Sequence, residues 1–224
     1  MKQFKISPSA CLMAIINITP DSFSQDGVLA GSEKNFIDRI VQKGREAVNN
    51  GVKIIDLGAE SSRPGAIPVD AKTQINRLLP AIKALKQLKQ CPTICIDTTL
   101  AEVAQKALEQ GATMINDISA LSDPKMANIV SEAKAKIILM HNQAEWGNFY
   151  SINHPSKQNL GNSYHAVNYD HVITEVLKDL LKSTKKALNA GIKKNNIILD
   201  PGIGFGKSVE DNLKLLAHID TFKK

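Results

Sequence analysis

The sequence predicts an α/β fold on a parallel sheet, of the (β/α)8 TIM-barrel type. Two observations predict it: short apolar runs alternate with amphipathic runs, and every apolar run ends at a polar residue of a small chemical set. Alternation of strand and helix without a repeated glycine fingerprint indicates a parallel sheet, open or closed. A chain of 224 residues is long enough for one such domain with a substantial core.

Short, β-branched apolar runs are the predicted strands. Each run is too short for a helix, and its continuous apolarity is typical of a strand covered on both faces. They are residues 11–18, 52–58, 93–98, 113–119, 136–141 and 196–200.

The segments between these runs carry a helical period of apolar residues. The clearest sets are Phe36, Ile37, Ile40, Val41 and Val48; Ile75, Leu78, Leu79, Ile82 and Leu85; and Val172, Ile173, Val176, Leu177, Leu180 and Leu181. A further helix is expected to begin near Val209, after Ser208 as its cap.

The polar residues at the strand ends favour a barrel over an open sheet. They are Asn17, Asp56, Asp97, Asn116 with Asp117, His141 and Asp200. A doubly wound sheet gathers its site at one switch point, so only two or three strands need such residues. A barrel points all its strand ends at one mouth.

Six strands are predicted, whereas a closed barrel of this type has eight. We therefore expect residues 1–224 to form a single (β/α) barrel domain that is truncated at its C-terminus, with about six βα units present and the last two missing. The alternative is a complete six-stranded open sheet. Residues 142–167 form a long polar loop after the fifth strand, a length typical of functional or disordered loops.

Composition excludes several classes of function. The net charge is +6, but only four of the 28 basic residues are arginine and the lysines are dispersed, so we expect no nucleic-acid partner. The chain carries neither a long uncharged apolar stretch nor a signal peptide, which predicts a cytoplasmic protein with no membrane partner. The cysteines lack metal-ligand spacing and are predicted to be buried thiols.

The stretch IILDPGIGFGKS, residues 197–208, resembles a phosphate-binding loop but does not fit one. A Walker A motif ending at Gly206, Lys207 and Ser208 needs glycine at position 201, where Pro201 stands. The dinucleotide pattern G-x-G-x-x-G meets Lys207 where its third glycine belongs. The sequence therefore gives no support for an ATP site here.

Two loops at the predicted mouth carry groups suited to a metal and an anion. Asn17, at the head of NITPDSFSQDG, offers a neutral oxygen of the kind that Mg²⁺ accepts alongside substrate phosphates. Ser62 and Arg63, in GAESSRPG, combine a hydroxyl with a guanidinium that matches phosphate oxygens. The alternatives are a turn capping the next helix and an ordinary Pro-Gly turn with an exposed arginine.

Asp97, Asn116 and Asp200 form a third group at the ends of three strands. Buried carboxylates need hydrogen-bond donors, and two Asp with an Asn can recognise a ring with alternating donors and acceptors, such as an aminopyrimidinone. Metal binding, or capping by backbone amides, would use the same residue types. His141 alone is interpreted as a hydrogen-bonded structural residue.

Three segments together resemble the signature segments of dihydropteroate synthase, the folate-pathway enzyme that sulfonamides target. They are MAIINITPDSFSQDG, GAESSRPGA and ILDPGIGFGKSVEDNLKLL, and IDTTLAEVAQKAL and MINDISAL resemble the stretches between them. The similarity extends from about Leu12 to Leu216 in the expected order.

The resemblance implies a transferase that condenses 6-hydroxymethyl-7,8-dihydropterin diphosphate with p-aminobenzoate to 7,8-dihydropteroate and pyrophosphate. It implies Mg²⁺ as cofactor, bound by Asn17, and contacts from Ser62 and Arg63 to the diphosphate. Arg63 would also act in catalysis, stabilising the charge of the leaving group.

The same resemblance assigns the pterin pocket. Asp97, Asn116 and Asp200 would line it, with Met140 and Phe205 as packing walls. Asp97 would also be catalytic, because a carboxylate beside the ring favours a pterin cation formed when pyrophosphate leaves first.

Some features depart from the family pattern. Ser62 replaces the usual threonine, Asn142 stands where methionine is common, and the 142–167 loop is longer than usual. The family's later Ser-Arg-Lys and Arg-x-His segments and the helices of its usual homodimer surface are expected to be missing. Two alternatives stay open: a pterin-binding methyltransferase domain, and a truncated barrel that binds pterin without turnover.

Overall fold

The computed structural model describes residues 10–18, 33–60, 68–143 and 166–223. Every predicted strand run contains a strand, which confirms the six strands of the sequence analysis. The strands are β1 (Met13–Asn17), β2 (Ile54–Gly58), β3 (Thr93–Asp97), β4 (Met114–Asp117), β5 (Lys136–Met140) and β6 (Ile197–Asp200).

Helices alternate with these strands. They are α2 (Glu33–Asn49), α3 (Ala71–Leu85), α4 (Ala101–Gln110), α5 (Met126–Glu132), α6 (Val172–Asn189) and α7 (Val209–Ala217), with short 3-10 turns at Lys194–Asn196 and Ile219–Lys223. The prediction that a helix starts at Val209 is confirmed: Ser208 Oγ accepts a hydrogen bond from the Asp211 N–H at 3.1 Å.

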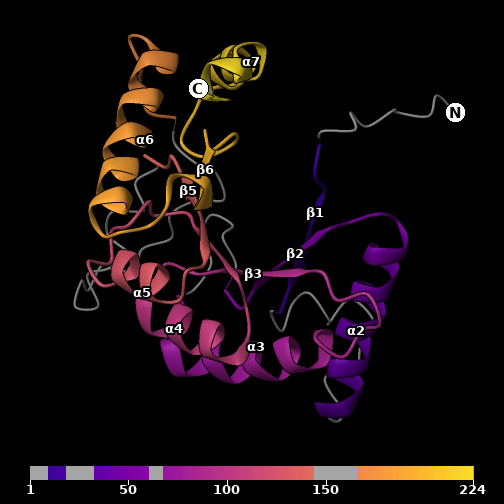
Figure 1. Cartoon of the computed structure of the whole chain (residues 1–224). Coiled ribbons are helices and arrows are strands. Elements are labelled where there is room, and N and C mark those ends of the chain that lie inside the picture. Colours follow the sequence, from indigo (N-terminus) through magenta and orange to yellow (C-terminus); the bar gives the residue numbers. More distant parts are fainter. Residues whose placement is uncertain (1–9, 19–32, 61–67, 144–165, 224) are drawn as a thin grey trace, which may run out of the picture.

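The strands form one parallel sheet in the order β1-β2-β3-β4-β5-β6. Because the order never reverses, the sheet has no switch point of the doubly wound kind, and right-handed crossovers place successive helices on the same side. Figure 1 shows α2 to α6 along the outer side of a curved sheet. This one-sided arrangement is the arc of a (β/α) barrel, which confirms the predicted fold class.

The main core lies between the sheet and its outer helices. Ile55, Leu57, Ile96 and Ile115 on the strands are fully buried against residues such as Ile82 of α3. Neighbouring side chains alternate between the two faces of a strand, so these residues all point outward from the concave side. The apolar outer face holds the strands in place for the polar side chains at the carboxyl ends of the inner face.

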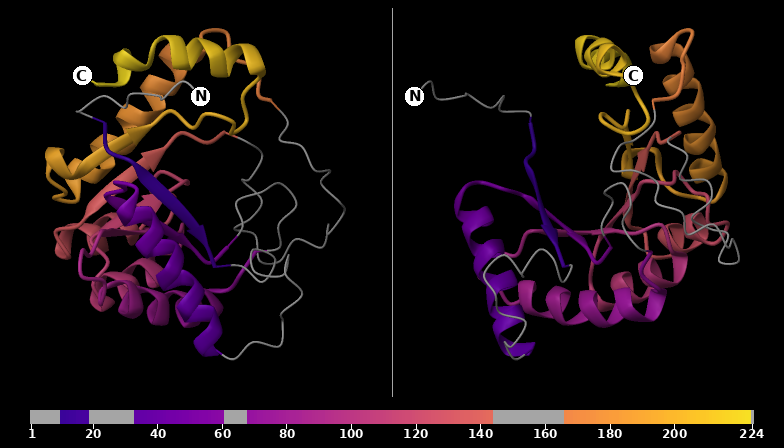
Figure 2. Two further views of the ribbon diagram at one scale, coloured as in Figure 1. Left: turned by 90° about the vertical axis from the view of Figure 1, so that its right-hand side faces the viewer. Right: turned by 180° about the vertical axis from the view of Figure 1, so that it is seen from behind.

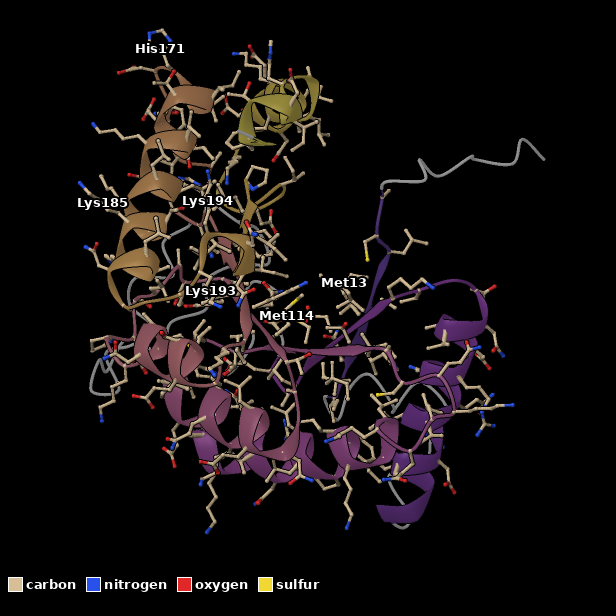
Figure 3. All side chains as sticks on the ribbon, viewed as in Figure 1. Met13, Met114, His171, Lys185, Lys193 and Lys194 are labelled. Atoms are coloured by element: carbon tan, nitrogen blue, oxygen red, sulfur yellow. The ribbon has the colours of Figure 1, made fainter. Side chains whose placement is uncertain are left out.

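The inner face of the sheet is set by the strand register. Asn17, Gly58, Asp97, Asn116 and Ile138 are successive register partners from β1 to β5, so they share one face. A smaller buried cluster joins Ile138 of this row to Cys95 and Met114 on the same face. Met13 and Met114, labelled in Figure 3, come from β1 and β4 on the same inner face.

The two edges of the sheet lie apart. Figure 2 shows β1 and β6 at opposite ends of the curve, and at those edges Ile15 and Ile198 are 66% and 38% exposed. At the β6 edge, α7 packs on α6 through a separate cluster that includes Val176, Leu180 and Leu215. Within the part of the chain that the structure describes, no helix has the length and apolarity needed to cross a bilayer.

Two details of the sequence interpretation are wrong. Asp56 does not end its strand, because β2 continues to Gly58, whose backbone pairs with both Asn17 and Asp97. Only Cys95 is a buried thiol, whereas Cys11 and Cys91 are exposed. Cys11 precedes edge strand β1, and Cys91 lies in the loop before β3. Both cysteines are therefore outside the strands, and burial of the neighbouring apolar strand residues does not extend to them.

Candidate functional site at the inner face of the sheet

Asn17 and Asp97 converge over a glycine at the carboxyl end of the sheet. They are the register partners of Gly58 on either side. A Cβ at position 58 would lie 3.3 Å from Asn17 Oδ1 and 3.4 Å from Asp97 Oδ2. Glycine therefore leaves space between two oxygens that any larger residue would narrow, and the structure brings these two predicted site residues together.

Asp56 and Asn116 form a buried pair next to Asp97. Asn116 Nδ2 donates to Asp56 Oδ2 at 3.0 Å, and Asp56 is 2% exposed. Among the described residues, Asp56 Oδ1 and Asn116 Oδ1 are buried without a hydrogen-bond partner. Buried polar atoms are almost always paired, so these two acceptors mark a place for a ligand that brings N–H donors.

The electrostatics of this pair and of Asp97 favour a ligand with donors. Burial raises the pKa of Asp56, while hydrogen bonds from Cys95 and Asn116 work in the opposite direction. Burial also raises the pKa of Asp97 well above its usual range, and negative charge on Asp56 and Glu60 adds to the rise. The inner face thus holds carboxyl groups whose ionised forms are destabilised until a donor or a positive charge arrives.

Asp117 follows Asn116 but points the other way and serves the fold. Its Oδ1 accepts from the backbone N–H and the hydroxyl of Ser119, and its Oδ2 accepts from the Leu121 N–H at 2.8 Å. These bonds hold a turn in which Ala120 and Leu121 have positive φ. The neighbouring Asn116 and Asp117 therefore divide between site and scaffold.

The end of β5 and β6 contributes a second part of the mouth. Met140 and Asp200 are register partners, and Met140 lies two residues beyond Ile138, the partner of Asn116. Met140 is 3% exposed, and Asp200 Oδ1 accepts from the Gly202 N–H at 2.7 Å. Phe205 lies in the turn that follows, partly buried.

The turn after β6 contains a buried lysine that the sequence interpretation set aside. Lys207 is 8% exposed, and its Nζ donates to the backbone oxygens of Gly202 at 2.8 Å, Phe205 at 2.9 Å and His141 at 3.3 Å. Burial lowers the pKa of Lys207 to about 8, although Asp200 and Asp211 oppose the shift. Its resemblance to a P-loop lysine was the only sequence signal for it.

His141 is buried behind this turn, 4% exposed. No described residue gives either ring nitrogen a hydrogen bond, since the nearest carboxylate, Asp179 Oδ2, is 3.6 Å from Nε2. Burial and the charge of Lys207 lower the pKa of His141 to about 4. His141 is therefore buried, as a structural residue would be, but within the described part of the chain it lacks the expected hydrogen bond.

Ser62 and Arg63 lie outside the described residues. On either side of them, Gln74 Nε2 donates to Glu60 Oε2 at 2.7 Å and to the Val69 oxygen at 2.9 Å. Gln74 Oε1 accepts from the hydroxyl of Thr98, the residue after Asp97, at 3.1 Å. A buried glutamine missed by the sequence interpretation thus joins both flanks of this loop to the end of β3.

The described residues offer only part of a metal site. They include no cluster of three or more His, Cys, Asp or Glu able to hold an ion. The oxygen of Asn17 is exposed at the mouth beside Asp97 Oδ2. A single neutral oxygen fits the way Mg²⁺ is bound when substrate phosphates and water complete its shell.

The fold and the site together define a class. A one-sided arc of parallel strands with polar residues at the strands' carboxyl ends is a barrel enzyme of the TIM type. Its inner face carries the buried acceptor oxygens of Asp56 and Asn116, which lack hydrogen-bond partners among the described residues. Comparisons with known proteins narrow this class.

The chain is similar over nearly its whole length to known dihydropteroate synthases. A profile described as pterin binding enzyme matches residues 13–224. The dihydropteroate synthase of Bacillus subtilis is 37% identical over 212 residues, 94% of this chain and 65% of that protein. That of Streptococcus pyogenes serotype M6 is 40% identical over 219 residues, 97% of this chain and 72% of that protein.

Solved structures agree. A dihydropteroate synthase from Clostridium difficile, crystallised in the presence of pteroic acid, has a TM-score of 0.79 and 35% identity, with 99% of this chain and 74% of that chain covered. The Xanthomonas albilineans enzyme with 4-aminobenzoic acid has a TM-score of 0.77 and 34% identity, with 94% and 67% covered. The chain belongs to the pterin-binding enzyme family, among the dihydropteroate synthases.

Proposed function

We propose that this chain condenses 6-hydroxymethyl-7,8-dihydropterin diphosphate with p-aminobenzoate to give 7,8-dihydropteroate and pyrophosphate. The observation that carries the proposal is the buried Asp56–Asn116 pair beside Asp97, with two acceptor oxygens that no described residue pairs. A pterin's amino and ring N–H groups are donors of the kind these acceptors lack. Similarity to synthases solved with pteroic acid and 4-aminobenzoic acid supports the same substrates here.

In this proposal Asp97, Asn116 and Asp200 bind the pterin, and Met140 and Phe205 pack on its ring. Asp56 joins them, because its free oxygen faces the same side as Asp97. The bond from the exocyclic methylene carbon to the diphosphate oxygen breaks first. The amine nitrogen of p-aminobenzoate then bonds to that carbon and loses a proton to solvent.

The raised pKa of Asp97 suits this sequence of events. In the empty site, burial disfavours its ionised form. Hydrogen bonds from the pterin, and the positive charge that develops on the ring as pyrophosphate leaves, both favour the carboxylate. Asp97 therefore stabilises the cation more strongly than it stabilises the neutral substrate, which is the condition for faster chemistry.

The diphosphate is assigned to Asn17, Ser62 and Arg63. Asn17 would hold a divalent cation, Mg²⁺ by the oxygen chemistry of the site. When bound, that ion would neutralise charge on the leaving group. Gln74 supports this side of the mouth, since it ties Glu60 and Val69 to Thr98.

The test follows pyrophosphate release from the pterin diphosphate with Mg²⁺, in the presence and absence of p-aminobenzoate. The expected result is release that depends on p-aminobenzoate, with 7,8-dihydropteroate formed in equal amount. Tight binding of the pterin diphosphate without any release of pyrophosphate would contradict the proposed synthase activity and support pterin binding without turnover. Methyl transfer from a methylated reduced pterin would instead support the methyltransferase.

A further inference from the structure

We propose that Lys207 is a positioning residue of the pterin pocket, whose ammonium group holds the turn of residues 201–206 against the end of β5. The inference rests on the proposed function for its pterin readout. Lys207 itself is not assigned to contact any substrate.

The hydrogen bonds of Lys207 are complete without a ligand. An ammonium group has three donors, and the Lys207 Nζ uses them on the backbone oxygens of Gly202, Phe205 and His141. No carboxylate of the described residues forms an ion pair with it. The group is therefore held by backbone dipoles rather than by a counter-ion.

This arrangement is the reverse of a phosphate loop. In a phosphate loop, backbone N–H groups point inward at an anion and the lysine reaches the same anion. Here carbonyl oxygens point inward, and the cation they surround is the chain's own lysine. The motif therefore resembles a Walker A loop in sequence but has the opposite polarity, because it surrounds a cation instead of an anion.

The turn can only adopt this shape because of its glycines. Gly202 has a φ of +68°, and a Cβ there would overlap the backbone oxygen of His141. Lys207 bonds to that same His141 oxygen and to Gly202 itself. The close approach of the turn to the end of β5 and the burial of the ammonium therefore depend on the same two groups, Gly202 and the His141 oxygen.

Two predicted pocket residues depend on the turn. Phe205 is one of the residues whose carbonyl group Lys207 holds, and its N–H donates to the Gly202 oxygen at 3.1 Å. Asp200 accepts from the Gly202 N–H, so its carboxylate is oriented by the same glycine. Loss of the ammonium leaves three buried carbonyl oxygens without this partner and frees the turn to move.

The first arm of the experiment needs no pterin. Amide hydrogen exchange compares Lys207→Met, which keeps the length and removes the charge, with the wild type. A matched control is Lys185→Met, because Lys185 on α6 is exposed and points away from the body in Figure 3. The Val167 N–H donates to the Gly206 oxygen of this turn at 3.0 Å. We expect about 10-fold faster exchange of the Phe205 and Val167 amides in Lys207→Met alone, with unchanged exchange in β2 and β3.

The second arm measures affinity for 6-hydroxymethyl-7,8-dihydropterin diphosphate. We expect about 10-fold weaker binding in Lys207→Met, near wild-type binding in Lys207→Arg, and no change in Lys185→Met. In Lys207→Ala, propylammonium should restore affinity, because it replaces the lost carbons and ammonium, whereas tetramethylammonium, which has no N–H donor, should not. Rescue of this kind also remains measurable if Lys207→Met fails to fold.

The outcomes separate the inference from the proposed function. Unchanged pterin affinity in a folded Lys207→Met overturns the positioning role, even if its melting temperature falls, and so does equal rescue by both cations. If the wild type binds no pterin, the proposed function fails in its own assay. Unchanged amide exchange in the turn of Lys207→Met would then refute, independently of pterin binding, the proposal that Lys207 holds this turn.

Discussion

The β2–β4 part of the mouth and the turn after β6 treat buried polar groups in opposite ways. Between β2 and β4, oxygens of Asp56 and Asn116 are buried without partners among the described residues, and burial disfavours ionisation of the Asp97 carboxyl. After β6, the buried Lys207 has an acceptor for every donor. The first region has buried acceptors that a ligand would have to pair, while in the second the chain itself supplies every hydrogen-bond partner of the ammonium. The unpaired atoms therefore mark the pterin site that we propose, and the satisfied ones mark the groups that hold its shape.

The largest expected effect is the loss of Asp97. Asp97→Ala should weaken pterin diphosphate binding by about 100-fold or more, because it removes a charge-assisted acceptor at the centre of the β2–β4 region. Isothermal titration measures it, with Asp38→Ala as the control, since Asp38 is an exposed carboxylate on α2. Normal pterin binding by Asp97→Ala would show that the pocket is assigned to the wrong residues.

The neighbours Asn116 and Asp117 give a sharper version of the same contrast. Asn116→Ala should weaken pterin binding by roughly 10-fold or more, since its amide faces the ligand. Asp117→Ala should leave binding within about threefold but lower the free energy of unfolding by about 2 kcal/mol, because it removes three hydrogen bonds from a strained turn. Urea unfolding and titration on both variants check this. The reverse pattern would contradict the division between site and scaffold.

The same contrast explains what the sequence could predict. The strand runs and their polar ends were readable, because apolar periodicity and residue type reflect burial directly. Asn17, Asp97 and Asn116 were proposed as site residues in this way, and the structure places them on one face of the sheet. Asp56 was assigned to a strand end, although alternation with Gly58 and register with Cys95 put it on the inner face. Counting residue parity along the strand would have added it to the site.

Lys207 could not be found by such rules. Whether a glycine-rich turn presents N–H or carbonyl groups inward depends on its φ and ψ angles. The positive φ of Gly202, Gly204 and Gly206 becomes visible only in the structure. Gln74 is similar, because two of its three partners, Glu60 and Thr98, lie 14 and 24 residues away, and no local pattern brings them together. Residue type indicates chemistry, whereas satisfaction of hydrogen bonds is a property of the fold.

A smaller effect concerns the stability of the ligand-free protein. The pKa of Asp97 is raised in the folded state, so its ionisation at neutral pH opposes folding, and this cost is absent below the ordinary carboxyl pKa. Asp97→Asn should therefore raise the free energy of unfolding at pH 7 by about 1 kcal/mol while weakening pterin binding. Urea unfolding at pH 7 and pH 3 checks this, with a gain expected only at pH 7. A loss of stability at pH 7 would mean that the empty site already satisfies the carboxylate.

The smallest expected effect comes from the satisfied region and has the opposite direction with pH. Burial lowers the pKa of Lys207 from 10.5 to about 8. Between these values the unfolded chain binds more protons than the folded chain, so stability rises as the pH increases through 8. The wild type should gain about 1 kcal/mol over Lys207→Met between pH 7.5 and pH 9.

This gain is measured as the difference between the urea unfolding curves of the two proteins. Burial raises the pKa values of Cys95 and Tyr169, so both groups lower the free energy of unfolding at alkaline pH. Both are present in the two proteins, so their contributions cancel in the difference. Lys207→Arg should lack the rise, because a guanidinium keeps its proton throughout this range. A flat difference between wild type and Lys207→Met would mean that the ammonium is solvated rather than buried among the three carbonyl oxygens. The carbonyl oxygens of the turn after β6 would then lack the ammonium as a partner, as the oxygens between β2 and β4 lack theirs among the described residues.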